Sequence, residues 1–431
     1  MSIVEITIAE LKEGMFVCGL DLPWMQNPFF RSKFAIKTQN EIAQLKAAGC
    51  KSLKIDTSKG LGLDSNALPS APGTTEPVEK LKEIACENES RPSEVSLQAP
   101  SFPATPSKHP LQEKPRNMEA LKERHKAAFD LRNKTLAAIQ DVNQSLAKGH
   151  ALSQGQILPI LDDLAGQLQE NEQAILATLT LKPDQSHLNT HLYNTLALAL
   201  SLGNALKLDQ ESLMHLGQAA LFHDVGWMKL PSFLVNKGRP LTPQESELAK
   251  QHVALGVAQL SKSKGFPQAV MNMVSSHHQP FSTLAQNINE LSPDEISRCV
   301  LRTVDTYDEI THGLFGNLGA IPGRAMKQLF GKVASGQFHK AVLSLFIHHM
   351  GVYPVGSAVQ LSDQSKGIVV HQTPDAPLKP QIMLCYDSGG IPLKVQTLLD
   401  IHTQESLEVE RFLDPLNKQD DPAGLLAITE V

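Results

Sequence analysis

An apolar helical segment that ends in two adjacent metal-ligand residues constrains this chain more than any other feature. The segment reads LGQAALFHD and finishes on His223 and Asp224. Its apolar residues recur at helical spacing, so a buried helix is predicted up to the pair. Imidazole nitrogens and carboxylate oxygens suit divalent transition metals. Taken alone, the pair is equally compatible with a buried His–Asp hydrogen bond that caps a helix.

Further candidate ligands are spread along the chain, each in a segment that is predicted to be helical. These candidates are His191, His252, His277, His278 and Asp305. Gly256 lies one turn after His252, so it allows another backbone to approach the same helix face. Asp308 lies one turn after Asp305, and we expect one of the two carboxylates to face inward. Six or seven such residues converge only if the helices pack as a bundle.

Other histidines fit less specific roles. His187 lies one turn before His191, and an exposed side chain is favoured over a ligand. His348 and His349 form a second pair without an acidic neighbour or a glycine, so packing or surface exposure is expected. We treat the remaining histidines, including His312, as background.

The sequence pattern predicts a mainly α protein: a helical bundle with a small α+β module before it and a small β appendage after it. Apolar residues recur at three and four over long stretches of the middle of the chain. A Pro-, Ser- and Thr-rich stretch cannot bury enough surface to offset its ordering entropy. The predicted segments are an α+β module at 1–60, a disordered linker at 61–116, a helical lead-in at 117–181, the main helical domain at 182–350, a β appendage at 351–402 and a flexible tail at 403–431.

The composition narrows the classes of function and location. The net charge is −6, and no basic stripe with interleaved aromatic residues appears, so nucleic-acid binding is not expected. The five cysteines are scattered without a C-x-x-C pair, which is typical of a reducing compartment. Neither a signal peptide nor a membrane-spanning apolar run is evident. We therefore predict a cytoplasmic protein and leave its oligomeric state open.

The chain resembles the HD-GYP family of HD-domain metal phosphohydrolases from about residue 182 to residue 370. The motifs that carry the resemblance are His223-Asp224, His252-x-x-x-Gly256, His277-His278, Asp305 and the turn at Gly351–Gly356. Residues 1–60 resemble an uncharacterised module that often precedes this domain. The resemblance implies a bacterial signalling protein that hydrolyses cyclic di-GMP with two or three divalent metal ions, and the ligand types do not distinguish Fe, Mn, Zn and Ni. The implied metal ligands are His191, His223, Asp224, His252, His277, His278 and Asp305.

Three departures from the family pattern concern the substrate rather than the metal. Trp227 stands where the family has a lysine that touches a substrate phosphate, and Lys229 is a nearby replacement. The loop after His278 reads QPFSTLAQNINELSP and lacks the Gly-Tyr-Pro motif that shapes the nucleotide pocket. The family's arginine and tyrosine after the last aspartate are also missing, although Arg324 follows downstream.

Three functional hypotheses follow from this pattern. The first is a phosphodiesterase for cyclic di-GMP or a related nucleotide, in which a dinuclear centre and a bridging hydroxide attack the phosphorus, with Asp224 and Lys229 as catalytic residues. The second is a non-catalytic sensor or scaffold that keeps metal and signals through protein partners, which would bind the linker and the helices of 117–181. The third is an HD-type phosphatase for a different nucleotide.

Overall fold

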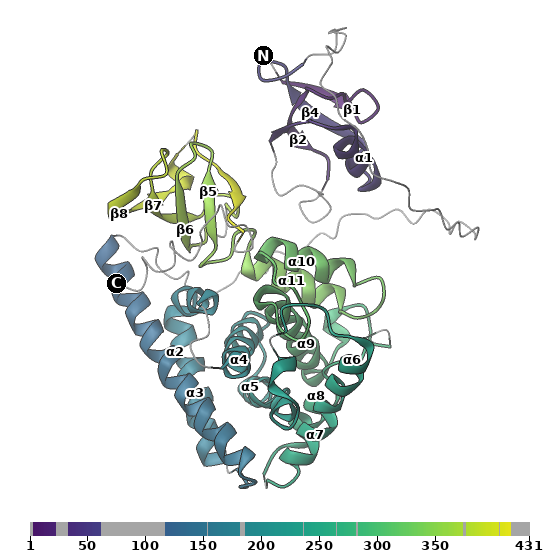
Figure 1. Cartoon of the computed structure of the whole chain (residues 1–431), viewed down its shortest axis with the longest axis vertical. Coiled ribbons are helices and arrows are strands. Elements are labelled where there is room, and N and C mark those ends of the chain that lie inside the picture. The colour runs from purple at the N-terminus through teal and green to yellow at the C-terminus, as the bar shows by residue number, and fades with distance from the viewer. Residues whose placement is uncertain are drawn as a thin grey trace, which may run out of the picture. The chain divides into compact units, whose positions relative to one another are not determined.

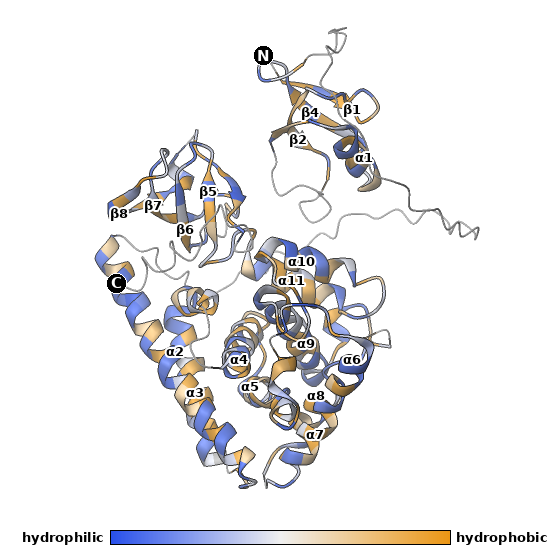
Figure 2. Cartoon of the chain, viewed as in Figure 1, coloured by the Kyte–Doolittle hydropathy of each residue, from blue (hydrophilic) through white to orange (hydrophobic). Residues whose placement is uncertain are grey.

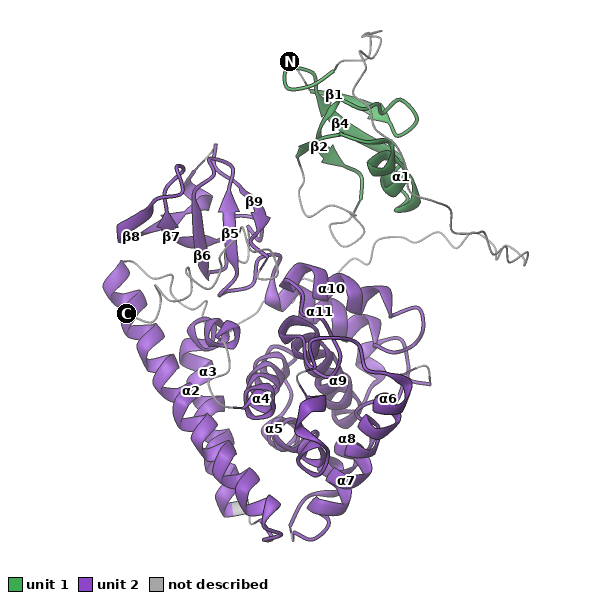
Figure 3. Cartoon of the chain, in the orientation of Figure 1, with its two compact units in different colours: residues 1–109 green, residues 110–431 purple. Residues whose placement is uncertain are grey.

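The chain divides into two compact units, residues 1–109 and residues 110–431 (Figure 3). The computed structural model describes residues 3–22, 33–61 and 117–414, except positions 153, 182–185, 236, 264, 282, 374–375 and 405. Nearly all of the predicted linker, from residue 62 to residue 116, lies outside the described residues, as does the predicted tail from residue 415.

The first unit is a four-stranded antiparallel sheet with one helix. Its strands lie in the order β1-β4-β2-β3. A capping box between Thr38 and Glu41 begins the helix, and Gly49, with a φ of +85°, follows its end. The elements are β1 (Ile3–Thr7), β2 (Phe16–Leu20), β3 (Phe34–Ala35), α1 (Gln39–Ala47) and β4 (Ser52–Asp56). Apolar residues of the sheet and of α1 form a core of their own, so the predicted α+β character is confirmed.

The second unit is a bundle of helices, as predicted. Its helices are α2 (Met118–Ala147), α3 (Gln154–Ala177), α4 (His187–Ala205), α5 (Gln210–Phe222), α6 (Pro243–Ala249), α7 (Gln251–Leu260), α8 (Gln268–Ser276), α9 (Pro293–His312), α10 (Pro322–Gly331) and α11 (Lys340–Met350). Short 3-10 helices interrupt the connections: η2 (Thr178–Thr180), η3 (Val225–Lys229), η4 (Ser232–Leu234), η5 (Ile288–Glu290) and η6 (Ile401–Thr403). The long helices α2 and α3 pack along each other at one side of the unit (Figure 1), and hydrophilic residues cover much of α2 (Figure 2).

Helix α4 is the centre of the bundle. Every residue from Thr190 to Gly203 is buried, because α2, α3, α5, α9 and α11 all pack against it. A helix that is enclosed on all sides must be apolar nearly all round, and ALALSL provides such a surface. Polar side chains on this helix, such as His191 and Asn194, are therefore held deep inside the protein. A polar side chain at such a buried position is costly unless a hydrogen-bond partner or a bound ion satisfies it.

The C-terminal part of the second unit is a five-stranded antiparallel sheet in the order β8-β7-β6-β5-β9. Its strands are β5 (Ala358–Leu361), β6 (Lys366–His371), β7 (Gln381–Tyr386), β8 (Pro392–Asp400) and β9 (Val409–Phe412). One face packs on α2, where Leu121 contacts the cluster that includes Ile368 and Met383. The predicted β appendage is present, and it extends further than expected, because β9 lies within the predicted tail.

No helix among the described residues is both long enough and apolar enough to cross a lipid bilayer.

Candidate metal centre

The pair His223-Asp224 lies where α5 gives way to η3, and two glycines set its distance from α7. A Cβ atom on Gly226 would lie 1.8 Å from the His252 carbonyl oxygen, which no side chain permits. A Cβ atom on Gly256 would lie 3.3 Å from the Gly226 nitrogen. The prediction that Gly256 allows a close backbone approach is therefore confirmed. This contact brings Asp224 next to His252.

The buried histidines of the centre are oriented by hydrogen bonds to their own helices. In three of them Nδ1 bonds the backbone carbonyl three residues earlier: His223 with Ala220 at 2.9 Å, His252 with Ala249 at 2.6 Å, and His277 with Val274 at 2.7 Å. A carbonyl oxygen only accepts, so each Nδ1 donates, and Nε2 of the neutral ring keeps a lone pair that can bind a metal ion. In His191, Nδ1 bonds Asp308 Oδ2 at 2.7 Å instead. All four Nε2 atoms are thereby free to bind a metal ion.

The first group of potential ligands, which we name the inner cluster, consists of His191, His223, Asp224 and Asp305. All four residues are buried, and one donor atom from each lies within 4.8 Å of the others. Asp305 Oδ1 is 3.3 Å from both His191 Nε2 and His223 Nε2. Asp224 Oδ2 is 3.4 Å from His191 Nε2 and 3.6 Å from His223 Nε2.

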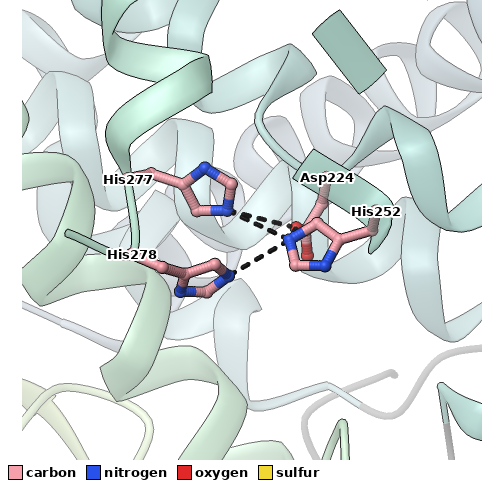
Figure 4. Close-up of side chains that lie close together, drawn as sticks. All are labelled: Asp224, His252, His277 and His278. Carbon is pink, nitrogen blue, oxygen red and sulfur yellow. Dashed lines mark hydrogen bonds and ion pairs between the residues drawn. The ribbon is translucent and has the colours of Figure 1, made fainter. Parts of the chain in front are cut away.

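The second group, the outer cluster, consists of Asp224, His252, His277 and His278, and their donor atoms also lie within 4.8 Å of one another (Figure 4). Asp224 Oδ1 is 3.2 Å from His252 Nε2 and 3.7 Å from His277 Nε2. His252 Nε2 is 3.1 Å from His278 Nε2. Asp224 belongs to both clusters and offers one carboxylate oxygen to each. The structure thus brings all seven predicted ligands together, while their role as ligands stays a prediction.

The unpaired atoms of these clusters fit a divalent cation. His191 Nε2, His223 Nε2 and both oxygens of Asp305 are buried without a hydrogen-bond partner in the protein, and such groups are costly unless something satisfies them. His252 Nε2 and His277 Nε2 face each other at 3.2 Å, although both Nδ1 atoms already donate elsewhere. Two facing lone pairs repel unless a cation lies between them.

The electrostatics of the centre keep its carboxylates charged. Burial raises the pKa of Asp224, but the neighbouring charges of His223 and His252 outweigh it and hold that pKa well below its usual range. Burial likewise opposes ionisation of Asp305, whereas the nearby imidazoles of His191 and His223 lower its pKa. Two ionised carboxylates among imidazoles form a site that attracts a metal cation.

A further layer of polar residues supports the inner cluster. Asp308 accepts from Asn194 Nδ2 at 2.8 Å and lies 2.9 Å from His312 Nδ1, and His312 Nε2 contacts the Leu179 carbonyl oxygen at 2.9 Å. Both Asp305 and Asp308 are thus buried, whereas only one was expected to face inward. Treating His312 as background was wrong, because its side chain contacts Asp308, one helical turn earlier on α9, and thereby belongs to this polar layer.

An aromatic stack takes the place of the family's lysine. The Trp227 ring lies 4.9 Å from the His252 ring at an interplanar angle of 16°, and 4.4 Å from the Phe315 ring at 23°. Phe315, with a φ of +50°, also contacts the His191 ring edge-on at 5.3 Å. The indole is 4% exposed, so it covers the ligands rather than reaching for a substrate.

The sequence pointed to two cations, Lys229 as a replacement for the lysine and Arg324 downstream of the family's missing arginine, and no contact of either with the predicted ligands is found among the described residues. Lys229 is exposed at the end of η3. Arg324 pairs with Asp414 at 3.6 Å. Sequence reasoning missed Arg302, whose Nη1 atom is 2.6 Å from His278 Nδ1 and 3.5 Å from Asp305 Oδ2. Its spacing of three residues before Asp305 on a helix was the available signal.

The histidines that were not expected to be ligands lie outside both clusters. His349 Nε2 is 2.7 Å from Ser201 Oγ and 3.4 Å from Glu172, which is a packing role. His348 is exposed, and His187 is half-buried at the start of α4.

Comparison with known proteins supports a three-part organisation. Residues 3–157 match a domain of unknown function (DUF3391), residues 159–338 match the HD domain, and residues 358–420 match a KOW domain associated with the HD domain. The last range contains β9 and extends past the predicted end of the β appendage. The DUF3391 match is longer than the predicted N-terminal module and includes α2.

Two relatives and one solved structure are similar to this chain. The cyclic di-GMP phosphodiesterase PA4108 of Pseudomonas aeruginosa is 25% identical over 402 residues, which cover 91% of this chain and 88% of that protein. The cyclic di-GMP phosphodiesterase PdeB of Borreliella burgdorferi is 23% identical over 208 residues, 47% of this chain and 53% of that protein. Bd1817, an HD-GYP-type protein from Bdellovibrio bacteriovorus, aligns with a TM-score of 0.41 and 13% identity over 80% of this chain and 98% of its own. Residues 159–338 of the chain match the HD domain, and the predicted resemblance to the HD-GYP family is confirmed.

Proposed function

We propose that this protein is a metal-dependent phosphodiesterase that hydrolyses cyclic di-GMP or a related nucleotide phosphodiester. The observation that carries the proposal is the shared carboxylate of Asp224, which offers one oxygen to each of two four-residue clusters. Two cations held a few ångströms apart act on both sides of a phosphorus centre in phosphodiester hydrolysis. Both similar curated proteins are named as cyclic di-GMP phosphodiesterases.

We propose that each cluster would hold one divalent transition-metal ion, with Asp224 contributing an oxygen to each cluster. When bound, the ions polarise the phosphodiester and make a water molecule nucleophilic near neutral pH. The two clusters offer eight donor positions from seven residues, and the described part of the chain holds no third group of this kind. Nitrogen and oxygen donors of this kind suit Fe, Mn, Zn and Ni alike, so the donor set does not select among them.

The protein's own residues hold the reacting groups in place. Asp308 fixes the His191 ring through its 2.7 Å hydrogen bond, and the backbone carbonyls do the same for the other buried rings. Such outer contacts orient metal ligands and raise their basicity. Trp227 and Phe315 exclude water from one side of the centre. We keep Lys229 as a predicted phosphate contact, which requires its exposed side chain to fold back over η3.

Purified full-length protein tests this proposal directly. Protein loaded with Mn or Fe is incubated with cyclic di-GMP, the linear product is measured, and bound metal is counted by elemental analysis. We expect turnover in the wild type and none in His223→Ala. His348→Ala is the matched control, because it removes an exposed histidine outside both clusters. Metal-loaded wild type that leaves cyclic di-GMP and a panel of related nucleotides intact would refute the proposal.

One observation favours a second candidate, a sensor that binds metal and nucleotide without turnover. Trp227 is buried against His252 and cannot supply the charge of the lysine that it replaces. In that case α2 and α3, which flank the bundle, would be the surface for protein partners. Binding of cyclic di-GMP to the metal-loaded protein without any linear product would select this candidate.

The cell compartment remains a proposal. The described cysteines Cys18, Cys50, Cys299 and Cys385 are all free thiols, which fits the reducing cytoplasm that we predict. Fractionation of cells that express the tagged protein tests the location.

A further inference from the structure

We propose that Arg302 binds a substrate phosphate at the edge of the outer cluster and supplies the cation that position 227 does not. The inference rests on the proposed function, because it assigns the phosphate contact of that same site. The guanidinium of Arg302 lies beside the predicted metal ligands, and no other arginine or lysine among the described residues contacts them.

Arg302 reaches both clusters from one helix. It lies on α9 one turn before Asp305, so the two side chains share a face. Its Nη1 atom is 2.6 Å from His278 Nδ1 and 3.5 Å from Asp305 Oδ2. The guanidinium also lies 5.7 Å from the centre of the Phe338 ring, and the side chain is 15% exposed. The arginine is thus held against the ligands while one edge stays open to solvent.

Metal binding would remove one partner that Arg302 has in this arrangement and weaken the other. An imidazole that binds a metal through Nε2 carries its proton on Nδ1, so His278 can then no longer accept a hydrogen bond from Arg302. The Asp305 carboxylate, in turn, becomes shared with a cation. The guanidinium of an arginine carries a positive charge and offers only N–H donors. A fixed positive charge beside two metal ions is unfavourable unless an anion lies between them, and a phosphodiester is such an anion.

A guanidinium group is well suited to binding a phosphate. Its planar fork can bind two phosphate oxygens at once. Among the described residues, Arg302 is the arginine or lysine whose nitrogen contacts the predicted ligands. Arg298, one turn earlier on α9, instead lies 4.7 Å over the Phe281 ring. Arg298 is therefore a matched control with the same charge, helix and type of aromatic neighbour.

The test compares four full-length proteins: wild type, Arg302→Gln, Arg302→Lys and Arg298→Gln. Metal content is measured first by elemental analysis. Calorimetry then gives the affinity of each metal-loaded protein for cyclic di-GMP and, separately, for inorganic phosphate. For Arg302→Gln we expect unchanged metal content and about ten- to hundredfold weaker binding of both probes, the range for a lost charge-assisted hydrogen bond. Arg302→Lys should recover part of the affinity, and Arg298→Gln should match the wild type.

Each outcome decides between the two proposals. Equal affinity of Arg302→Gln and wild type for both probes overturns the inference, and so does a loss of metal from Arg302→Gln, since Arg302 would then brace His278 instead. If the wild type binds phosphate through Arg302 but hydrolyses no nucleotide, the inference stands and the proposed function fails. If wild type and Arg302→Gln hydrolyse cyclic di-GMP with the same kcat/KM, the function stands and the inference fails. Should Arg302→Gln not fold, the contrast between Arg302→Lys and wild type carries the same decision.

Discussion

The inner and outer clusters share Asp224 but differ in how the protein encloses them. Every residue of the inner cluster is buried, and Asp308, Asn194 and His312 form a further polar layer behind it. The outer cluster ends on His278, an exposed residue whose support comes from the side chain of Arg302. A fully enclosed site holds its ion through rigid surroundings, whereas a site with an open edge can admit a substrate. On the proposed function, we expect the inner cluster to be mainly responsible for metal retention and the outer one for substrate contact.

The largest effect should come from Asp224, because it serves both clusters. We expect Asp224→Ala to lose both ions and to lower hydrolysis by more than about a hundredfold, since residues that merely support a ligand are already worth about ten- to hundredfold. Elemental analysis and a product assay measure the two effects. By contrast, His277→Ala should keep the inner ion. Loss of a single ion from Asp224→Ala would show that the carboxylate does not bridge.

The aromatic stack connects the two clusters and should affect stability next. Trp227→Ala removes a buried indole that packs on His252 and Phe315. We expect it to lower the free energy of unfolding by about 3–5 kcal/mol, as for other buried large side chains. Denaturant unfolding of metal-loaded protein measures the change. Trp227→Phe is the control that keeps a ring in the stack, and an equal loss in that variant would argue against stacking.

A substitution at Asp308 should affect the inner cluster and leave the outer cluster unchanged. Asp308→Asn keeps the size of the side chain but weakens the support of the His191 ring, so the inner ion should bind about ten- to hundredfold more weakly. The outer ion should keep its affinity, because His252 and His277 are braced by backbone carbonyls. Titration with a metal-competing chelator resolves the two ions. Equal weakening of both would mean that the clusters are not independent.

The smallest effect concerns the helix that leads into the outer cluster. Hydrogen bonds from Arg239, which has the larger effect, and from Lys237 lower the pKa of Glu245 from its ordinary 4.5. Glu245 also completes the capping box of α6. A carboxyl whose pKa is lowered by folding stabilises the fold above its unfolded pKa and stops doing so as the pH falls towards the folded one. Metal-free Glu245→Gln should therefore melt slightly below metal-free wild type at neutral pH, and the gap should close in acid. A constant gap would assign the effect to the cap alone.

The sequence was most informative where the evidence was local. Helical spacing and the order of His and Asp residues predicted the bundle and the seven candidate ligands, because each motif lies within one or two turns of a helix. The contact of Asn194 with Asp308 was not predictable in this way, since it joins α4 and α9 across more than a hundred residues. Strand β9 was missed for a similar reason: its four residues become a strand only by pairing with β5. The contact of His312 with Asp308 is local to α9 and was overlooked in the sequence.

Arg302 and Trp227 show a different limit. Trp227 was recognised as a departure, but its position between two rings depends on Phe315, which lies in a loop at positive φ. The spacing of Arg302 from Asp305 was visible in the sequence, but its contact with His278 was not. In both cases the sequence showed the residue type but not the contact with a distant segment, Phe315 for Trp227 and His278 for Arg302.

The carbonyl contacts of His223, His252 and His277 have a consequence for how this protein acquires its metals. Each ring is locked at its working angle by its own helix, so the entropic cost of arranging the donors is met during folding rather than during loading. A finished chain can then exchange one ion for another without rebuilding its interior. On the proposed function, we therefore expect the supply of ions in the surroundings to decide which element occupies the site.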